Sequence, residues 1–161
     1  MAKQFYSIKI EGLDELKAAA DKAGSEYVHL MEQAMGRAVT KVQNDIKENI
    51  TNKGISNTGN LRRSVQKHEV TATRGVVGVD EKYGAYVEFG TSPHFPPVAP
   101  LERWAQTKLG TPGLGFIIAR KIARSGTPAQ PYAVPAFVSN VDFIFKQFVE
   151  AGEIIVKTMG R

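Results

Sequence analysis

Residues 27–50 read YVHLMEQAMGRAVTKVQNDIKENI, and their apolar side chains recur every three or four positions. This spacing places them on one face of an α-helix of about seven turns, with Lys41 and Asp45 outside that face. The apolar stripe consists of Leu30, Met31, Ala34, Met35, Ala38, Val42, Ile46 and Ile50. We therefore predict one long amphipathic helix that packs by a single face.

Shorter elements are predicted before this helix. Residues 5–10 alternate between polar and apolar side chains, which is typical of a short strand. Residues 13–23 are rich in alanine and lysine and are followed by Gly24, so they are predicted to form a short helix with a glycine after its end. Ser25 is the predicted N-cap of the long helix.

An antiparallel meander is predicted after the long helix. Residues 52–60 are rich in glycine and asparagine and indicate a loop, from which Thr58 or Asn60 caps a helical turn over 61–64. Strands are predicted over Val65–Thr73, Val76–Val79 and Tyr83–Phe89, with a turn at Arg74-Gly75. The first strand of the chain is expected at the edge of this sheet.

The composition changes after Gly90, because all eight prolines lie between positions 93 and 135. Two short helices are predicted there, from Pro100 to Leu109 and from Leu114 to Arg124, with a flexible glycine-rich link between them. A last helix is predicted from Pro135 to Met159. The expected fold is a single α+β domain over residues 1–161, in which two long helices pack on an antiparallel sheet of three to four strands. Residues 91–131 form a Pro-rich helical insertion within it.

Composition restricts the class of protein. The chain has 161 residues, of which 42% are hydrophobic, and this is enough for the core of one domain. It contains no cysteine, so disulfides and thiolate chemistry are excluded. The first residues lack the apolar core of a signal peptide, and no apolar run is long enough to span a membrane. We therefore expect assembly in a cytosol-like compartment.

Motifs that would carry catalysis or hold a cofactor are missing from the sequence. The three histidines, His29, His68 and His94, are far apart and show no metal-ligand spacing. The glycines of residues 110–115 lack the lysine of a phosphate-binding loop, and no nucleophile elbow is present. The sequence therefore predicts a protein that is not an enzyme and needs neither metal nor cofactor.

Positive charge is concentrated in the Pro-rich segment. The net charge of the chain is +5. Residues 91–140 contain five basic side chains and a single acidic one, Glu102. The basic residues are Arg103, Lys108, Arg120, Lys121 and Arg124, and Arg62-Arg63 forms a second cluster. One interpretation is a solvated helix face, and the other is a surface that contacts DNA or an acidic partner through non-specific phosphate contacts. Trp104 is expected either to pack into the domain or to anchor an interface.

Three segments resemble a known family. Residues 58–64 read TGNLRRS, residues 77–79 read VGV and are followed by YGAYVEFGT at 83–91, and residues 131–137 read PYAVPAF. In this order they resemble the bacteriophage tail-component, or tail-completion, family typified by the tenth gene product of a lambdoid phage. The residues that carry the resemblance are Gly59, Leu61, Tyr83, Tyr86, Glu88, Phe89, Gly90, Thr91, Pro131 and Pro135. Phe89 is expected to anchor the strand end in the core, and Gly90 to allow a turn.

The chain departs from the compact members of this family in two ways. About forty residues separate the threonine of the second segment from the proline of the third, and Tyr132 replaces the usual phenylalanine. The resemblance implies a structural virion protein at the head–tail junction, bound to connector and tail-tube proteins. It also implies a homo-oligomeric ring, with a hexamer favoured, that contacts genomic DNA non-specifically. The alternative is a basic DNA-binding module without enzymatic activity.

Overall fold

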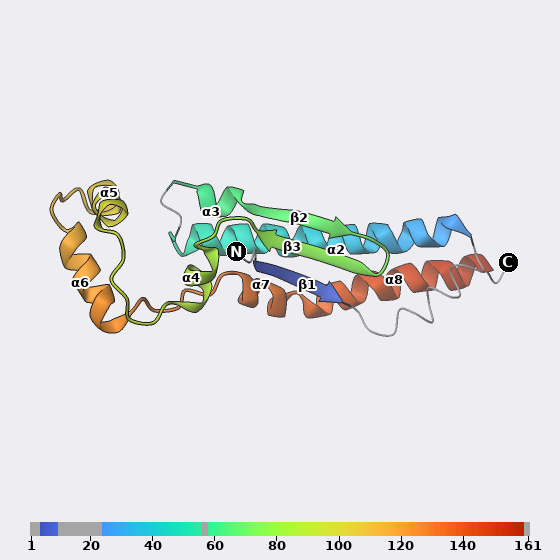
Figure 1. The fold of residues 1–161 in the computed structure, drawn as a ribbon. Helices are drawn as coiled ribbons and strands as arrows, with labels where there is room; N and C mark the ends of the chain where they lie inside the picture. Colours follow the sequence, from blue (N-terminus) through green and yellow to red (C-terminus); the bar gives the residue numbers. More distant parts are fainter. Residues whose placement is uncertain (1–3, 10–23, 56–57, 160–161) are drawn as a thin grey trace.

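The protein is elongated and belongs to the α+β class, which confirms the class predicted from the sequence (Figure 1). The computed structural model describes residues 4–9, 24–55 and 58–159. The helix predicted over 13–23 lies outside the described residues. The elements in chain order are β1 (Gln4–Lys9), α2 (Ser25–Asn52), α3 (Asn60–Arg63), β2 (Val65–Val70), β3 (Arg74–Val79), α4 (Gly84–Phe89), α5 (Val98–Leu109), α6 (Gly115–Ser125), α7 (Ala133–Ser139) and α8 (Val141–Met159).

Helix α2 is the centre of the core, as its amphipathic sequence predicts. The predicted stripe lies largely in the buried core, and its side chains pack against the sheet on one side and against α7 and α8 on the other. Burial of this much apolar surface is the main favourable term in folding. The residue that precedes the helix is Gly24, and no side chain caps the helix, so the expected cap at Ser25 is wrong.

The sheet has the order β1-β3-β2, and both pairings are antiparallel. The hairpin turns at residues 71–73, where the Thr71 hydroxyl accepts a hydrogen bond from the backbone N–H of Arg74. The turn predicted at Arg74-Gly75 is therefore wrong, because both residues already belong to β3. A Cβ on Gly75 would collide with the side chains of Met35 and Val39, so this glycine lets the sheet approach α2 closely.

Residues 84–89 form helix α4, so the strand predicted over Tyr83–Phe89 is wrong. The β-like composition of the segment is outweighed by tertiary contacts. Gly84 and Glu88 are four residues apart and both are buried, which is the spacing of one helix face. Phe89 leaves 58% of its surface exposed, so it does not anchor the core as expected.

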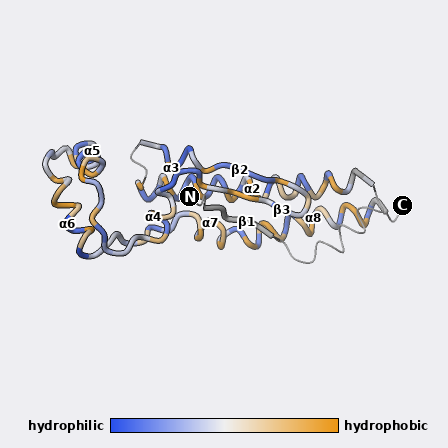
Figure 2. The backbone as a smooth tube through the Cα atoms, in the orientation of Figure 1, coloured by the Kyte–Doolittle hydropathy of each residue, from blue (hydrophilic) through white to orange (hydrophobic). Residues whose placement is uncertain are grey.

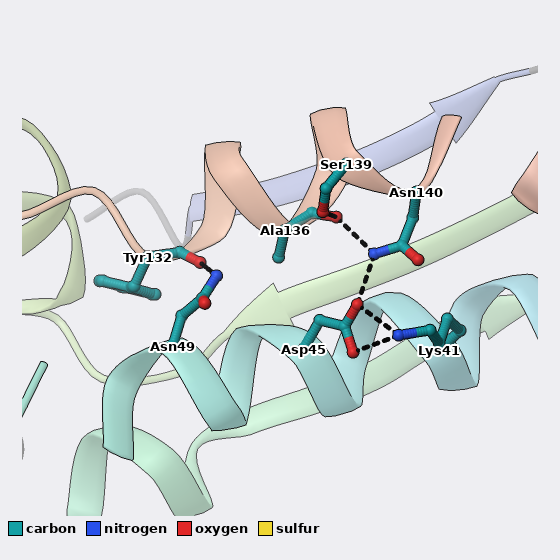
Figure 3. A network of polar contacts seen from close by, with 7 residues as sticks. All are labelled: Lys41, Asp45, Asn49, Tyr132, Ala136, Ser139 and Asn140. Atoms are coloured by element: carbon teal, nitrogen blue, oxygen red, sulfur yellow. Dashed lines mark hydrogen bonds and ion pairs between the residues drawn. The ribbon is translucent and has the colours of Figure 1, made fainter. Parts of the chain in front are cut away.

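The last helix is divided in two, because Asn140 interrupts the helix predicted from Pro135 to Met159. The Asn140 side-chain amide donates to the Ala136 carbonyl and to Asp45 Oδ2, both at 2.7 Å (Figure 3). Burial raises the pKa of Asp45, but the hydrogen bonds from Lys41 and Asn140 outweigh it and leave that pKa below its ordinary value. This polar network fixes the break in the helix against α2.

Candidate assembly surfaces

Two of the family-like segments meet at one buried carboxylate. Glu88 of α4 is only 1% exposed, and its oxygens accept hydrogen bonds from three backbone N–H groups at the start of α7. Oε2 accepts from Tyr132 at 2.7 Å and Ala133 at 2.9 Å, and Oε1 accepts from Val134 at 2.9 Å. A helix begins with four N–H groups that lack intrahelical partners. Glu88 satisfies three of them, and the fourth position is Pro135, which has no N–H.

Further contacts fix the same junction. The Tyr132 side chain is buried, and its hydroxyl donates to the Gly84 carbonyl at 3.0 Å. The backbone carbonyl of Tyr132 accepts a hydrogen bond from the Asn49 side chain at 2.9 Å (Figure 3). A Cβ on Gly84 would approach the Tyr132 hydroxyl to 2.8 Å, so this position requires glycine. Helices α2, α4 and α7 are therefore joined at one point, and the segment between α4 and α7 leaves the body there.

An arm of two extended chain segments connects α5 and α6 to the body. Thr91 and Thr127 pair in an antiparallel bridge, with backbone hydrogen bonds of 3.0 and 3.2 Å and a hydroxyl–hydroxyl contact of 2.9 Å. Gly90 and Gly126 flank the bridge with positive φ angles of 73° and 69°. A Cβ on either glycine would collide with the backbone of the opposite segment. Gly90 therefore has a backbone conformation that a side chain would hinder, as expected, and the cause is the crossing of the two segments.

Helices α5 and α6, here called the lobe (residues 98–125), pack against each other at one end of the molecule (Figure 1). Ala105 and Ala119 are fully buried. The Glu102 carboxylate accepts the N–H groups of Gly113 and Gly115, and these bonds hold its pKa below the ordinary value. The link between the helices, predicted as flexible, is thus held by a side chain of α5. The Glu102 carboxylate therefore makes its hydrogen bonds within the lobe.

A groove separates the lobe from the body. It has a volume of about 1730 Å³ and is lined by α3, α4, the arm and both lobe helices. Its walls include the aromatic side chains of Tyr83, Tyr86 and Trp104. They also carry the cations Lys53, Arg103 and Lys108, and none of its described lining residues is acidic. Trp104 is partly exposed in this groove, so of its two expected roles the interface position agrees with its location.

The predicted basic residues do not form one surface. Arg103 and Lys108 line the groove, whereas Arg120, Lys121 and Arg124 line a separate shallow hollow of about 400 Å³ on α6. The second cluster lies on α3, where Arg63 is engaged locally: its guanidinium donates to the Thr58 carbonyl at 3.0 Å. All seven side chains, including Arg62, are solvent-exposed.

The other motif residues have structural positions. Gly59 precedes α3 with a φ of 77°, and Leu61 is fully buried in the core. Tyr83 and Tyr86 are exposed at the groove, and burial together with the nearby Glu81 charge raises the pKa of Tyr83. Pro131 precedes the Tyr132 junction and is exposed.

Over residues 4–9, 24–55 and 58–159, no three histidine, cysteine or acidic side chains come together in a way that would hold a metal ion. No helix in that part combines the length and the apolar character that crossing a bilayer requires.

Comparison with protein families finds a match for one segment of the chain. Residues 12–90 match the family described as "Bacteriophage HK97-gp10, putative tail-component". This segment of the chain is therefore similar to a bacteriophage tail-component family. No curated protein and no solved structure matches the chain significantly.

The tail-component segment includes the first two family-like motifs and ends at Gly90, where the arm begins. The resemblance seen in the sequence is thereby confirmed, and it supports a structural role in a bacteriophage. The third motif lies beyond the matched residues, but the structure joins it to the second through Glu88. Sequence reasoning missed this pairing, because Glu88 and Tyr132 are 44 residues apart and no local pattern links them.

Proposed function

We propose that this protein is a non-enzymatic virion subunit that acts at the head–tail junction of a tailed phage. In this role it forms a ring, with a hexamer favoured, between the connector and the tail tube. The observation that carries the proposal is the match of residues 12–90 to a bacteriophage tail-component family. Localisation in the virion, at the junction or at the top of the tail, follows from this role.

The charge distribution supports a place near DNA. The segment 91–131 contains five basic residues and one acid, whereas the remainder contains sixteen basic residues and fifteen acids. The one acid, Glu102, is bound by backbone N–H groups of its own lobe. The segment 91–131 therefore carries nearly all of the net positive charge, and its basic residues lie on the lobe, which the arm connects to the body. A ring that surrounds genomic DNA would use such a surface for non-specific phosphate contacts.

The test is deletion of the gene from a producing phage, followed by electron microscopy of the lysate. We expect filled heads and separate tails, and restoration of joined particles when the wild-type protein is supplied from a plasmid. The purified particles should then contain the protein at the junction, as shown by gold-labelled antibody. Intact infectious particles from the deletion strain would refute the proposed role.

A second candidate function, a basic DNA-binding module that does not assemble, is favoured by the lobe alone. The hollow on α6 places Arg120, Lys121 and Arg124 together. If they contact phosphates, replacing all three by alanine should make DNA binding less sensitive to salt. The slope of the logarithm of the DNA-binding constant against the logarithm of the salt concentration should become less steep by roughly 2–3. Alanine at Lys82, Lys146 and Lys157 removes the same charge from the body and is the control. Absence of duplex binding by the wild type at low salt would eliminate this candidate.

A further inference from the structure

Helix α8 has a second apolar face, which is exposed among the described residues 4–9, 24–55 and 58–159. Val141, Phe145, Val149 and Val156 are 50%, 67%, 42% and 70% exposed, respectively. Their spacing of four, four and seven residues places them on one stripe of the helix, about 22 Å long. Ile144, Phe148 and Ile155 form the buried face of α8, which packs against α2. Figure 2 shows hydrophobic residues recurring along the length of this helix.

We call Val141, Phe145, Val149 and Val156 the outer stripe. Large exposed apolar surfaces on a soluble protein mark sites of association. The outer stripe lies beside a polar face that includes Asp142 and Glu153, and α8 carries three acids against two bases. A partner for this surface would therefore present an apolar channel with cationic walls.

The groove beside the lobe has that chemistry. Its walls are largely apolar, its described lining includes Lys53, Arg103 and Lys108, and it contains no acid. With a volume of about 1730 Å³, the groove is large enough to receive a row of apolar side chains from another chain. Its exposed Trp104 and Tyr86 are residue types that anchor protein interfaces.

We infer that the outer stripe of one copy seats in the groove of a second copy. The groove lies at the lobe end of the molecule, and α8 runs from the body toward the opposite end, so the two surfaces of one chain do not meet (Figure 1). A contact between two different surfaces is head-to-tail, and its repetition generates a closed ring when the rotation between subunits closes. The inference rests on the proposed ring and assigns the surfaces that build it.

A cross-linking experiment tests this contact directly. The chain has no cysteine, so each introduced thiol is unique. Thr107→Cys places a thiol on the groove wall, and Val149→Cys places one on the outer stripe. The two variants are mixed at high concentration and treated with a short bis-maleimide. The control mixture pairs Thr107→Cys with Lys67→Cys, whose side chain is exposed on β2 and takes no part in the proposed contact.

We expect a mixed dimer from the Thr107 and Val149 variants and its loss in the control mixture. Equal yields in both mixtures, absence of any mixed product, or predominant coupling of Val149→Cys to itself would each overturn the inference. Self-coupling of that variant would indicate a two-fold pairing of α8 helices instead.

Charge exchange provides a second measurement. The double variant Arg103→Glu/Lys108→Glu in the groove partner should lose the mixed dimer. Adding Asp142→Lys/Glu153→Lys to the stripe partner should restore it, which misfolding cannot do. Failure of this restoration would contradict the assigned surfaces.

The proposed function fails independently of this contact. If cross-linking succeeds but the deletion strain still yields joined particles, the interface stands and the head–tail role is refuted. If the deletion separates heads from tails but no mixed dimer forms, the role stands and the inferred interface is refuted.

Discussion

Replacing Glu88 by glutamine tests whether the buried carboxylate holds the start of α7. In the wild type, two N–H groups share Oε2 and a third reaches Oε1. A glutamine that keeps its oxygen at the Oε2 position turns its NH₂ group toward the Val134 N–H, so two donors face each other. The charge-assisted bonds from Tyr132 and Ala133 also become neutral bonds, which are about half as strong.

The magnitude follows from these lost interactions. An N–H group left without an acceptor costs about 1–3 kcal/mol, and we add the weakening of the two remaining bonds. We therefore expect Glu88→Gln to lower the free energy of unfolding by about 2–4 kcal/mol. Glu88→Ala leaves all three N–H groups without the carboxylate. We expect a loss of roughly 3–5 kcal/mol, because Tyr132 and Ala133 are buried and water reaches only the exposed Val134.

Urea unfolding followed by far-ultraviolet circular dichroism measures both changes at neutral pH. Glu150→Gln is the matched control, since Glu150 is exposed on α8 and its contact with Lys146 is 3.9 Å long. We expect this surface change to alter the free energy by less than about 0.5 kcal/mol. If Glu88→Gln unfolds at the same urea concentration as the control, the capping role of the carboxylate is refuted.

Three further changes test other parts of the structure. Gly126→Ala adds a Cβ that collides with the Thr91 carbonyl at a positive φ, so it should lower stability by at least about 1 kcal/mol and expose the arm to limited proteolysis. Unchanged cleavage would contradict the crossing of the arm segments. Asp45→Asn should reduce stability near neutral pH, because the folded-state pKa of Asp45 lies below its ordinary value of 3.8 and the ionised form is favoured. The stabilisation by the ionised carboxylate is present above pH 3.8 and is lost as the pH falls below that value. In urea titrations at acid pH, the difference in free energy of unfolding between variant and wild type should therefore narrow. A difference that stays constant with pH would contradict the assignment. Phe89→Ala should change the thermal midpoint little, since the side chain is mostly exposed, and a large fall would show that it packs in the core.

Local sequence patterns were sufficient wherever one face of an element dictates its structure. The 3.6-residue period of α2 predicted both the helix and most of the side chains that it buries, because burial of a continuous stripe requires that period. Helices α5 and α6 were predicted within two residues at each end by proline and glycine positions. The concentration of positive charge in residues 91–131 is also a property of the sequence alone.

Only the tertiary structure decided the elements whose contacts come from distant residues. The segment 84–89 has the composition of a strand, but it folds as a helix because Gly84 meets Tyr132 and Glu88 meets the start of α7. Asn140 divides the last helix because Asp45 lies across from its side chain.

For the candidate interface, too, the sequence determined one part and the tertiary structure the other. The sequence determined that residues such as Phe145 and Trp104 are available for packing, and that cations surround Trp104 on α5. Whether each of them lies in the core or on the surface depends on how the helices are placed against one another. A helix with apolar residues around more than half of its circumference has two faces to bury, and its period does not say which of them the rest of the chain covers.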